Sequence, residues 1–423
     1  SRGLGDVYKR QQLADEAICI GPGPSAQSYL NMEQIISATM VSGADAIHPG
    51  FGFLSENARF AELCEKCGIT FVGPPSKVIR MLGNKKIARS TMIAAGVPVV
   101  PGSEGDVEDI ETGLKEAERI GYPVIIKAAL GGGGKGMRVA NTPEEFPEAY
   151  ATARKESEIA FGDGTMYIEH FVVNPRHIEF QILADSFGNV IHLGERDCSI
   201  QRNHQKMIEE SPSAAVSPEL REKMGHAAVT AAKAAGYVNA GTIEFLLEPD
   251  GKFWFMEMNT RIQVEHPVTE WVTGIDLVKE QLKIASGMPL EIAQEDVRIQ
   301  GHAIECRINA ENPQKNFRPS PGTIQGAHFP GGNGIRVDTC VYNGCKIPPY
   351  YDSMLAKLIV HAGNRKEAIA KMQSALGEVI IDGIDTNIDY QYEILKDEDY
   401  QSGNFDTGFL ASHIIAGVKI NEN

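Results

Sequence analysis

The sequence predicts an α/β protein with two or three domains. Short apolar strands alternate with helical patterns from residue 12 to about residue 82, which is typical of a parallel sheet. Further along the chain, two apolar runs flank Asp250 and Gly251, a dipeptide suited to the tight turn of a β-hairpin. A chain of 423 residues is long enough to give several domains substantial cores.

The first region, residues 1–82, is expected to form an open α/β domain. A helix is predicted over Ser55–Cys67. The strands are predicted at Ala17–Ile20, Ala46–Ile47 and Thr70–Val72.

A linking helix that contains Lys85 is predicted over residues 83–98. The two prolines of Val97–Pro101 mark a joint after it. The helix is therefore expected to connect the first domain to a second one.

Residues 99–171 are expected to form a compact α/β unit, small enough to close as a lid over a bound nucleotide. Tyr122–Lys127 is predicted to be a buried strand that ends in a lysine, and the glycine-rich run Gly131–Gly136 follows it. Successive glycines let backbone N–H groups approach a polyphosphate, while Lys127 and Lys135 supply positive charge. The run is neither a P-loop nor the spaced glycine motif of a dinucleotide fold. A flexible linker is the alternative.

The remaining region, residues 172–423, is strand-rich at first. His177–Leu183 alternates polar and apolar residues, and the turn Asp185–Asn189 leads to a second strand over Val190–Gly194, which predicts a hairpin. Helices are predicted at about 217–236, 275–287 and 365–378.

The second hairpin predicts a metal site. If Asp250 and Gly251 alone form its turn, Glu244 lies directly opposite Glu257, with Cβ atoms about 4.5–5.5 Å apart. Two carboxylates so close repel each other unless a cation lies between them. With the Asn259 amide nearby, these oxygen ligands suit Mg²⁺ or Mn²⁺ better than zinc. The alternative is a surface hairpin with two solvated glutamates, and a looser turn would shift the register.

Charged residues follow this hairpin closely. Arg261, Glu265 and His266 lie within a few residues of the predicted metal ligands. Such a cluster suits a site that holds an anion and moves a proton. A solvated loop is the alternative.

Composition narrows the class of protein. The net charge of −16 argues against a general nucleic-acid binder, and no apolar run reaches the roughly 18 residues that a membrane span needs. The chain has 7 cysteines, an odd number, and shows no signal-peptide pattern. We therefore expect a reduced, cytoplasmic compartment and no membrane or nucleic-acid partner.

Several segments in chain order resemble the biotin carboxylases, a family within the ATP-grasp superfamily. They are His48–Asn57, the glycine loop Gly131–Gly136, Glu195–Lys206, Glu257–Glu270, Glu305–Glu311 and Tyr350–Lys357. The resemblance runs from about Leu13 to about Asn387. An ATP-grasp fold alone would also allow carbamoyl-phosphate synthetase or peptide-type ligases, but Arg261–His266, Arg-Ile-Gln-Val-Glu-His, is similar to the carboxylase version.

The resemblance implies an ATP-grasp fold, with the ATP-grasp region at about 89–286. It adds an amino-terminal Rossmann-like (pre-ATP-grasp) domain, the small α/β lid, and a carboxy-terminal mixed α+β domain that follows the ATP-grasp core within residues 172–423. It also implies a homodimer.

The implied reaction consumes Mg-ATP and bicarbonate. ATP phosphorylates bicarbonate to carboxyphosphate, and the ureido N1 of biotin captures its CO₂. This is the first half-reaction of acetyl-CoA carboxylase in fatty acid biosynthesis. The sequence lacks a Met-Lys-Met biotinylation segment, so biotin is expected on a separate carrier protein, with carboxyltransferase subunits as further partners.

Residue roles carry over from the family by position. Glu244, Glu257 and Asn259 would hold Mg²⁺ or Mn²⁺. The nucleotide would contact Lys85, Lys127, Gly131, Gly132, Gly133, Gly134, Glu169, Val172, His177, Gln201, His204 and Leu246. Arg261, Gln263 and Val264 would hold bicarbonate, with Lys206 as a second cation, and Glu265 would remove its proton. Arg307 would stabilise the enolate-like oxygen of biotin.

One segment departs from the family pattern. Ser1–Gln11 does not match and resembles an artefact of sequence assembly or cloning, where the family has an opening strand, helix and second strand of about 30 residues or more. We expect this loss to expose an apolar sheet edge and to leave the amino-terminal domain marginally stable or aggregation-prone. Two alternatives follow: an ATP-grasp ligase for another carboxylate, or a nucleotide-binding module without turnover.

Overall fold

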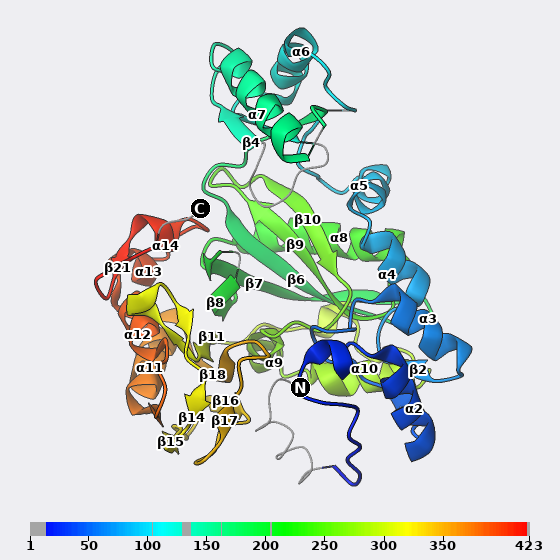
Figure 1. Ribbon diagram of the computed structural model, residues 1–423, viewed down its shortest axis with the longest axis vertical. Coiled ribbons are helices and arrows are strands. Elements are labelled where there is room, and N and C mark those ends of the chain that lie inside the picture. The colour runs from blue at the N-terminus through cyan, green and yellow to red at the C-terminus, as the bar shows by residue number, and fades with distance from the viewer. Residues whose placement is uncertain (1–13, 104, 129–136, 162, 204, 421–423) are drawn as a thin grey trace. The chain divides into compact units, whose positions relative to one another are not determined.

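The computed structural model describes residues 14–103, 105–128, 137–161, 163–203 and 205–420 (Figure 1). These residues form two compact units. The described residues of the first unit come from 14–97, 176–245 and 257–420, and those of the second from 98–175 and 246–256. The predicted domain boundaries stay predictions.

The first unit begins with a small parallel sheet and four α-helices. Strand β1 (Ala46–Ile47) pairs with β2 (Thr70–Phe71) in parallel, as the alternating pattern predicts. The helices are α2 (Met32–Ser42), α3 (Ala58–Lys66), α4 (Ser76–Leu82) and α5 (Lys85–Ala94), and a 3-10 turn, η1, spans Ser25–Gln27. The strand predicted at Ala17–Ile20 is absent, because an apolar run becomes a strand only beside a partner and the described residue pairs of β1 all involve β2.

Asparagine caps set the starts of α2, α3 and α5. The Asn84 side chain accepts hydrogen bonds from the N–H groups of Lys86 and Ile87, so it begins α5 and places Lys85 in its first turn. The predicted linking helix is therefore α5, and it is separate from α4, which ends before Gly83.

An eight-stranded sheet dominates the first unit, in the order β10-β9-β6-β7-β8-β11-β18-β16 (Figure 1). Its strands are β6 (Arg176–Ala184), β7 (Val190–Arg202), β8 (Gln205–Ser211), β9 (Asn239–Leu247), β10 (Phe253–Asn259), β11 (His302–Asn309), β16 (Ile335–Thr339) and β18 (Met354–Ala362). The β6–β7 hairpin is confirmed, with Asp185 accepting hydrogen bonds from the N–H groups of Phe187 and Asn189 in its turn.

Helices lie on both faces of this sheet. On β11, Ile304, Cys306 and Ile308 pack in one apolar core with α11, while Ala303 packs with α9 on the other face. Alternate residues of a strand point to opposite faces, so Glu305 and Arg307 share the α9 face. The helices are α8 (Pro218–Ala234), α9 (His266–Thr273), α10 (Leu277–Ala285), α11 (Arg365–Glu378), α12 (Ile388–Lys396), α13 (Glu398–Ser402) and α14 (Phe409–Ser412). The predicted α8, α10 and α11 are confirmed, and α9 was not predicted.

Short paired strands and turns complete the carboxy-terminal part. The pairs are β12 (Glu311–Asn312) with β13 (Arg318–Pro319), β14 (Gly322–Thr323) with β17 (Lys346–Ile347), β15 (Gly326–His328) with β19 (Ile380–Asp382), and β20 (Ile414–Ile415) with β21 (Val418–Lys419). Two 3-10 turns are η2 (Gln294–Asp296) and η3 (Pro313–Lys315).

The second unit is a three-stranded antiparallel sheet with two helices. Its order is β4 (Met137–Ala140), β3 (Val124–Ala128), β5 (Met166–His170), with helices α6 (Ile110–Ile120) and α7 (Phe146–Phe161). Val124 and Ile126 are buried in one core with residues of both helices, whereas Ile125 and Lys127 are only half-buried. The strand predicted to be buried therefore buries one face and leaves Lys127 on the other.

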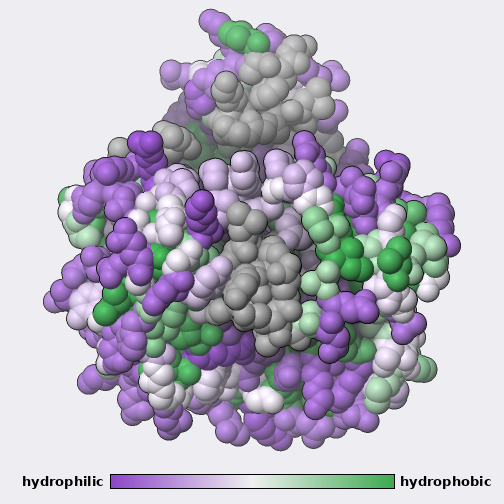
Figure 2. Space-filling view, turned by 60° about the horizontal axis from the view of Figure 1, so that its bottom comes forward, coloured by the Kyte–Doolittle hydropathy of each residue, from purple (hydrophilic) through white to green (hydrophobic). Residues whose placement is uncertain are grey.

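Charged and polar side chains dominate the surface in view. Figure 2 shows a mainly hydrophilic face on which hydrophobic residues form separate patches. In the part of the chain that the structure describes, every helix is too short or too polar to span a bilayer.

We predict that Gly225→Ala destabilises the first unit. An added Cβ on α8 would lie 2.4 Å from Nε2 and 2.7 Å from Cε1 of His192 on β7. Relieving this overlap costs about 1–3 kcal/mol, which exceeds the gain of about 1 kcal/mol in helix propensity. Chemical denaturation of the purified variant measures the difference.

Gly377→Ala is the matched control. Nothing lies within 4 Å of an added Cβ at this position of α11, so the variant should gain up to about 1 kcal/mol of stability. Two variants with the same sign of change would contradict the packing argument.

Candidate active site

The turn of the β9–β10 hairpin, which carries the acidic pair Glu244 and Glu257, differs from the prediction. Glu248 N–H donates to Lys252 C=O at 2.8 Å, and Gly251 N–H donates to Glu248 C=O at 3.0 Å. Pro249, Asp250 and Gly251 therefore form a three-residue turn, with Gly251 at φ +86°, and the expected two-residue turn is wrong. A proline before Asp250 and a glycine that tolerates positive φ favour the longer loop.

The alternation of buried residues on β10 slips by one position after this turn. Met256 and Glu257 are both exposed, between buried Phe255 and Met258. The carboxylates of Glu257 and Glu244 nevertheless repel each other. Protein atoms crowd its carboxylate despite its exposure, so desolvation raises the pKa of Glu257 first and repulsion from Glu244 raises it further.

The acidic pair can accept a divalent cation. Glu257 forms no ion pair among the described residues, and Lys85 only partly offsets its charge repulsion. The buried Asn259 donates from Nδ2 to Glu244 Oε1 at 2.7 Å, which places an amide beside the carboxylates. Two carboxylates and an amide oxygen are ligands that fit Mg²⁺ or Mn²⁺.

Lys206 on β8 lies among carboxylates from different elements. Its Nζ is 2.5 Å from Glu179 Oε2, 3.0 Å from Glu244 Oε1 and 2.8 Å from Glu265 Oε1. Burial by itself lowers the pKa of Lys206, but the charges of Glu179 and Glu265 outweigh it and hold the pKa well above its ordinary value. The ammonium group therefore stays charged.

Glu244 is held ionised by the same group. Burial acts to raise its pKa, but Lys206 and His177 outweigh it and lower the pKa. His177 Nε2 lies 3.0 Å from Glu244 Oε2. The structure thus brings the predicted His177, Lys206, Glu244 and Asn259 together in one unit.

Glu265 is buried between two cations. Oε1 accepts from Lys206 Nζ, and Oε2 accepts from an Arg307 terminal nitrogen at 2.8 Å. Burial acts to raise the pKa of Glu265, and the charges of Lys206 and Arg307 reverse this and hold it well below its ordinary value. The carboxylate is therefore ionised and has no proton to lose, although the two cations that keep it ionised also make it a weaker base.

The backbone around Glu265 is fixed by hydrogen bonds. Lys357 Nζ donates to Val264 C=O at 2.8 Å, and His266 Nδ1 lies 2.8 Å from Gln263 C=O. Pro267 then follows in the first turn of α9, where its missing N–H costs nothing. The side chain of Glu265 is therefore held at the start of a helix.

Arg261 is bound to two side chains of the first unit, one of them from its amino-terminal part. Its Nε donates to Glu56 Oε2 at 2.9 Å, and one terminal nitrogen donates to Gln263 Oε1 at 2.7 Å. The predicted bicarbonate-binding residues Arg261 and Gln263 therefore contact each other directly.

The β7–β8 hairpin carries other predicted nucleotide contacts. Gln201 is buried and pairs with Lys206 across the hairpin. At this end of the hairpin, the Arg202 guanidinium lies 4.3 Å from the centre of the Phe317 ring. His204 lies outside the described residues, as do Gly131, Gly132, Gly133 and Gly134 of the glycine loop.

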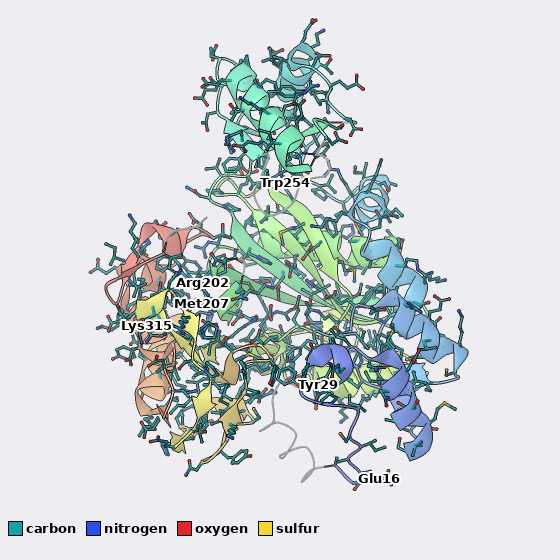
Figure 3. All side chains as sticks on the ribbon, viewed as in Figure 1. Glu16, Tyr29, Arg202, Met207, Trp254 and Lys315 are labelled. Carbon is teal, nitrogen blue, oxygen red and sulfur yellow. The ribbon has the colours of Figure 1, made fainter. Side chains whose placement is uncertain are left out.

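The second unit holds the remaining nucleotide candidates. Lys127 Nζ lies 2.5 Å from Glu169 Oε2, diagonally across β3 and β5. Val172 and Leu246 are half-buried in this unit. Trp254, which lies with Leu246 on the β9–β10 hairpin and is labelled in Figure 3, donates to Glu248 Oε1 at 2.6 Å.

The sequence did not single out three residues that support this site. Glu179 is fully buried, with Oε1 2.5 Å from Nε of the equally buried Arg196. Arg196 also donates to Gln181 Oε1 at 2.8 Å, and Lys357 holds the Val264 carbonyl. The sequence could have indicated these residues by their position inside predicted strands, because a charge that a strand buries requires a partner.

Fold and site together define a class. A sheet with an acidic pair and a buried ionised carboxylate, in a chain that also has a small α/β unit with a lysine, fits an ATP-dependent ligase of the ATP-grasp type. The ATP binding domain of the carbamoyl-phosphate synthase L chain matches residues 84–293. The biotin carboxylase N-terminal domain matches residues 7–79, and the biotin carboxylase C-terminal domain matches residues 305–412. The chain belongs to the biotin carboxylase family.

Curated relatives agree over nearly the whole chain. The chain is 57% identical over 407 residues to biotin carboxylase 1 of Bacillus subtilis (strain 168), covering 96% of this chain and 90% of that protein. It is 55% identical over 403 residues to the biotin carboxylase of Haemophilus influenzae, covering 95% and 90% respectively.

Solved structures agree in fold. The biotin carboxylase domain of a thermophilic 2-oxoglutarate carboxylase, bound to ADP without magnesium, superposes with a TM-score of 0.91 at 51% identity, over 96% of this chain and 90% of that one. The corresponding domain dimer from Hydrogenobacter thermophilus, in complex with MgADP, ADP and bicarbonate, gives 0.85 at 50% identity, over 97% and 91%. The predicted resemblance, ATP-grasp fold and ATP-dependent ligase class are confirmed.

We predict that Glu257→Gln weakens stabilisation by Mg²⁺. The substitution removes one charged oxygen ligand and also removes the repulsion from Glu244, so the metal-free variant should be at least as stable as the wild type. The increase in melting temperature on adding Mg²⁺ in the presence of ADP measures this, because a ligand stabilises the state it binds.

Glu222→Gln serves as the control, since this exposed glutamate of α8 has no part in the acidic pair. It should keep the full Mg²⁺ increment. An unchanged increment in Glu257→Gln would remove Glu257 from the metal site.

Proposed function

We propose that this chain carboxylates biotin on a carrier protein, using Mg-ATP and bicarbonate, as the first half-reaction of acetyl-CoA carboxylase. The observation that carries the proposal is the position of Glu265, an ionised and buried carboxylate held between Lys206 and Arg307. A base fixed between two cations suits the deprotonation of bicarbonate, whose product is doubly negative.

Binding of bicarbonate is assigned to the loop before α9. Arg261, Gln263 and the Val264 backbone would hold the anion beside Glu265, with Lys206 as a second cation. Arg261 now contacts Glu56, so an anion would exchange that partner for itself. Because the guanidinium already lies next to Gln263, little rearrangement is needed.

Nucleotide binding is assigned to residues of the ATP-grasp region. Mg²⁺ or Mn²⁺ held by Glu244, Glu257 and Asn259 would neutralise charge on the ATP phosphates during transfer to bicarbonate. Lys85, Lys127 and the glycine loop Gly131–Gly134 would contact these phosphates. Glu169, Val172, His177, Gln201, His204 and Leu246 would contact the adenosine part.

Arg307 is assigned to biotin. When the ureido N1 loses its proton, negative charge develops on the ureido oxygen. A fixed guanidinium stabilises that charge without reorganising at the moment of reaction. Arg307 can do so because its pKa is held above its ordinary value by Glu209 and Glu265, despite a burial that acts to lower it.

The partners follow from the reaction. Carboxylated biotin must pass to a carboxyltransferase, so we assign the chain carboxyltransferase subunits as partners beside the carrier protein. A homodimer in the cytoplasm is the expected form, and the solved relative from Hydrogenobacter thermophilus is a dimer.

Glu265→Gln tests this function. Loss of the base should lower bicarbonate-dependent release of phosphate from Mg-ATP by about 10²- to 10⁴-fold. ATP binding should persist, because Lys206 and Arg307 remain and lose a competing anion. Phosphate release is measured with bicarbonate and free biotin each added or withheld.

The control is Glu280→Gln, a buried carboxylate of α10 that pairs with Lys283 outside this site. It should retain turnover. Phosphate release driven by another acid would favour a different ATP-grasp ligase, and Mg-ATP binding without turnover in the wild type would favour a binding module.

A further inference from the structure

Two glutamates behind Arg307 face each other across the sheet. Glu305 on β11 is paired directly with Glu209 on β8 in antiparallel register. Side chains at such positions share a face, with Cβ atoms about 4.5–5.5 Å apart. Both residues are fully buried, so neither carboxyl reaches water. None of the site assignments above involves them.

The charges around the pair do not match two anions. Arg307 Nε lies 2.5 Å from Glu209 Oε1, without the alignment of a hydrogen bond. Its terminal nitrogen is already bound to Glu265. Lys357, opposite Arg307 on β18, donates to the Val264 carbonyl and lies 3.3 Å from Asp338.

The oxygens of Glu305 lack donors. Among the described residues, neither of them has a hydrogen-bond partner, whereas Glu209 has the Arg307 guanidinium as its ion-pair partner. A buried carboxylate without donors is costly, whereas a protonated carboxyl is itself a donor. One proton on the pair would supply the missing hydrogen bond and remove one of two adjacent negative charges.

We propose that Glu209 and Glu305 together hold one proton, and that this singly charged pair positions Arg307 against Glu265. Both are positioning residues, since neither lies where substrate is assigned. The inference rests on the proposed function for its role in the reaction, but the shared proton itself does not depend on it. With a single charge, Glu209 holds the guanidinium at Nε while Glu265 holds its other end. With two charges, the pair would draw Arg307 away from Glu265.

The electrostatics of the pair agree with a shared proton. Desolvation is the main cause that raises the pKa of Glu305 well above its ordinary value, and the charge of Glu209 raises it further against Lys357 and Arg307. Desolvation also raises the pKa of Glu209 to about 7, against the charge of Arg307. The other titratable groups that interact electrostatically with the pair are Cys198 on β7, Lys206 on β8, Glu265 just before α9, Cys306 and Arg307 on β11, and Lys357 on β18.

Glutamine substitutions test whether the Glu209 and Glu305 pair carries one negative charge or two. Glu209→Gln and Glu305→Gln each leave one carboxyl, which can carry the single charge, so each should lower kcat by no more than about threefold. The double substitution removes that charge and should lower kcat by more than about tenfold, a non-additive result. If the losses in kcat, expressed as activation free energies, are additive, the two single variants together account for the double variant. That result would overturn the proposal.

Two further measurements do not depend on activity. A protonated carboxyl gives an infrared C=O band distinct from that of a carboxylate, so the wild type minus Glu305→Gln difference spectrum should contain it at neutral pH. Its absence would overturn the shared proton even if turnover is normal. The folded protein binds this proton and the unfolded chain releases it above the ordinary pKa of 4.5, so stability should fall as pH rises toward the raised value. The fall should be smaller in Glu305→Gln.

The neighbouring Glu210 provides a matched control. It is equally buried but lies on the other face of β8, bound to His302 Nε2 at 2.9 Å and Arg365 Nε at 2.7 Å. Burial acts to raise its pKa, and these partners outweigh burial and lower it to about 2. Glu210→Gln should destabilise the fold. It should leave intact both the infrared band and the fall in stability as pH rises. A lost band in this variant would overturn the assignment to the Glu209 and Glu305 pair.

Discussion

One buried ammonium group joins the parts of this site. Lys206 lies within 3.0 Å of carboxylates from Glu179, Glu244 and Glu265, which come from three different segments of the chain. A charge taken out of water is stable only when oppositely charged groups surround it, and removing one partner from a buried pair costs about 3–5 kcal/mol. Glu244 of the acidic pair and Glu265, the proposed base, therefore share a common cation, and the position of each depends on it.

The large sheet separates structural from chemical groups by its two faces. On β11, Ile304 and Cys306 join an apolar core with α11, while Glu305 and Arg307 point toward α9. A shift of one residue in register would exchange these sets, placing charges in the apolar core. The register of β8, β11 and β18 is therefore a requirement for the electrostatics of the site as well as for its packing.

The loop before α9 is fixed before any substrate binds. Lys357 holds the Val264 carbonyl, the His266 ring lies against the Gln263 carbonyl, and Arg261 is bound to Glu56 and Gln263. Groups that are already oriented need little reorganisation when charge develops, which is the main source of electrostatic catalysis. Two of these four contacts, from Lys357 and Glu56, come from residues far apart in the chain, so the loop depends on distant parts of the first unit.

Local patterns in the sequence were enough for the family, the α/β class and five of the helices, α3, α5, α8, α10 and α11, because caps, turns and motifs act over a few residues. They also predicted the candidate site residues. Tertiary structure decided what depends on distant partners. The Asp250–Gly251 turn became three residues long, Ala17–Ile20 formed no strand, and the roles of Glu179, Arg196 and Lys357 as supports emerged only from their contacts. A sequence shows which charges are present, but their burial and pairing arise only when strands separated along the chain lie side by side.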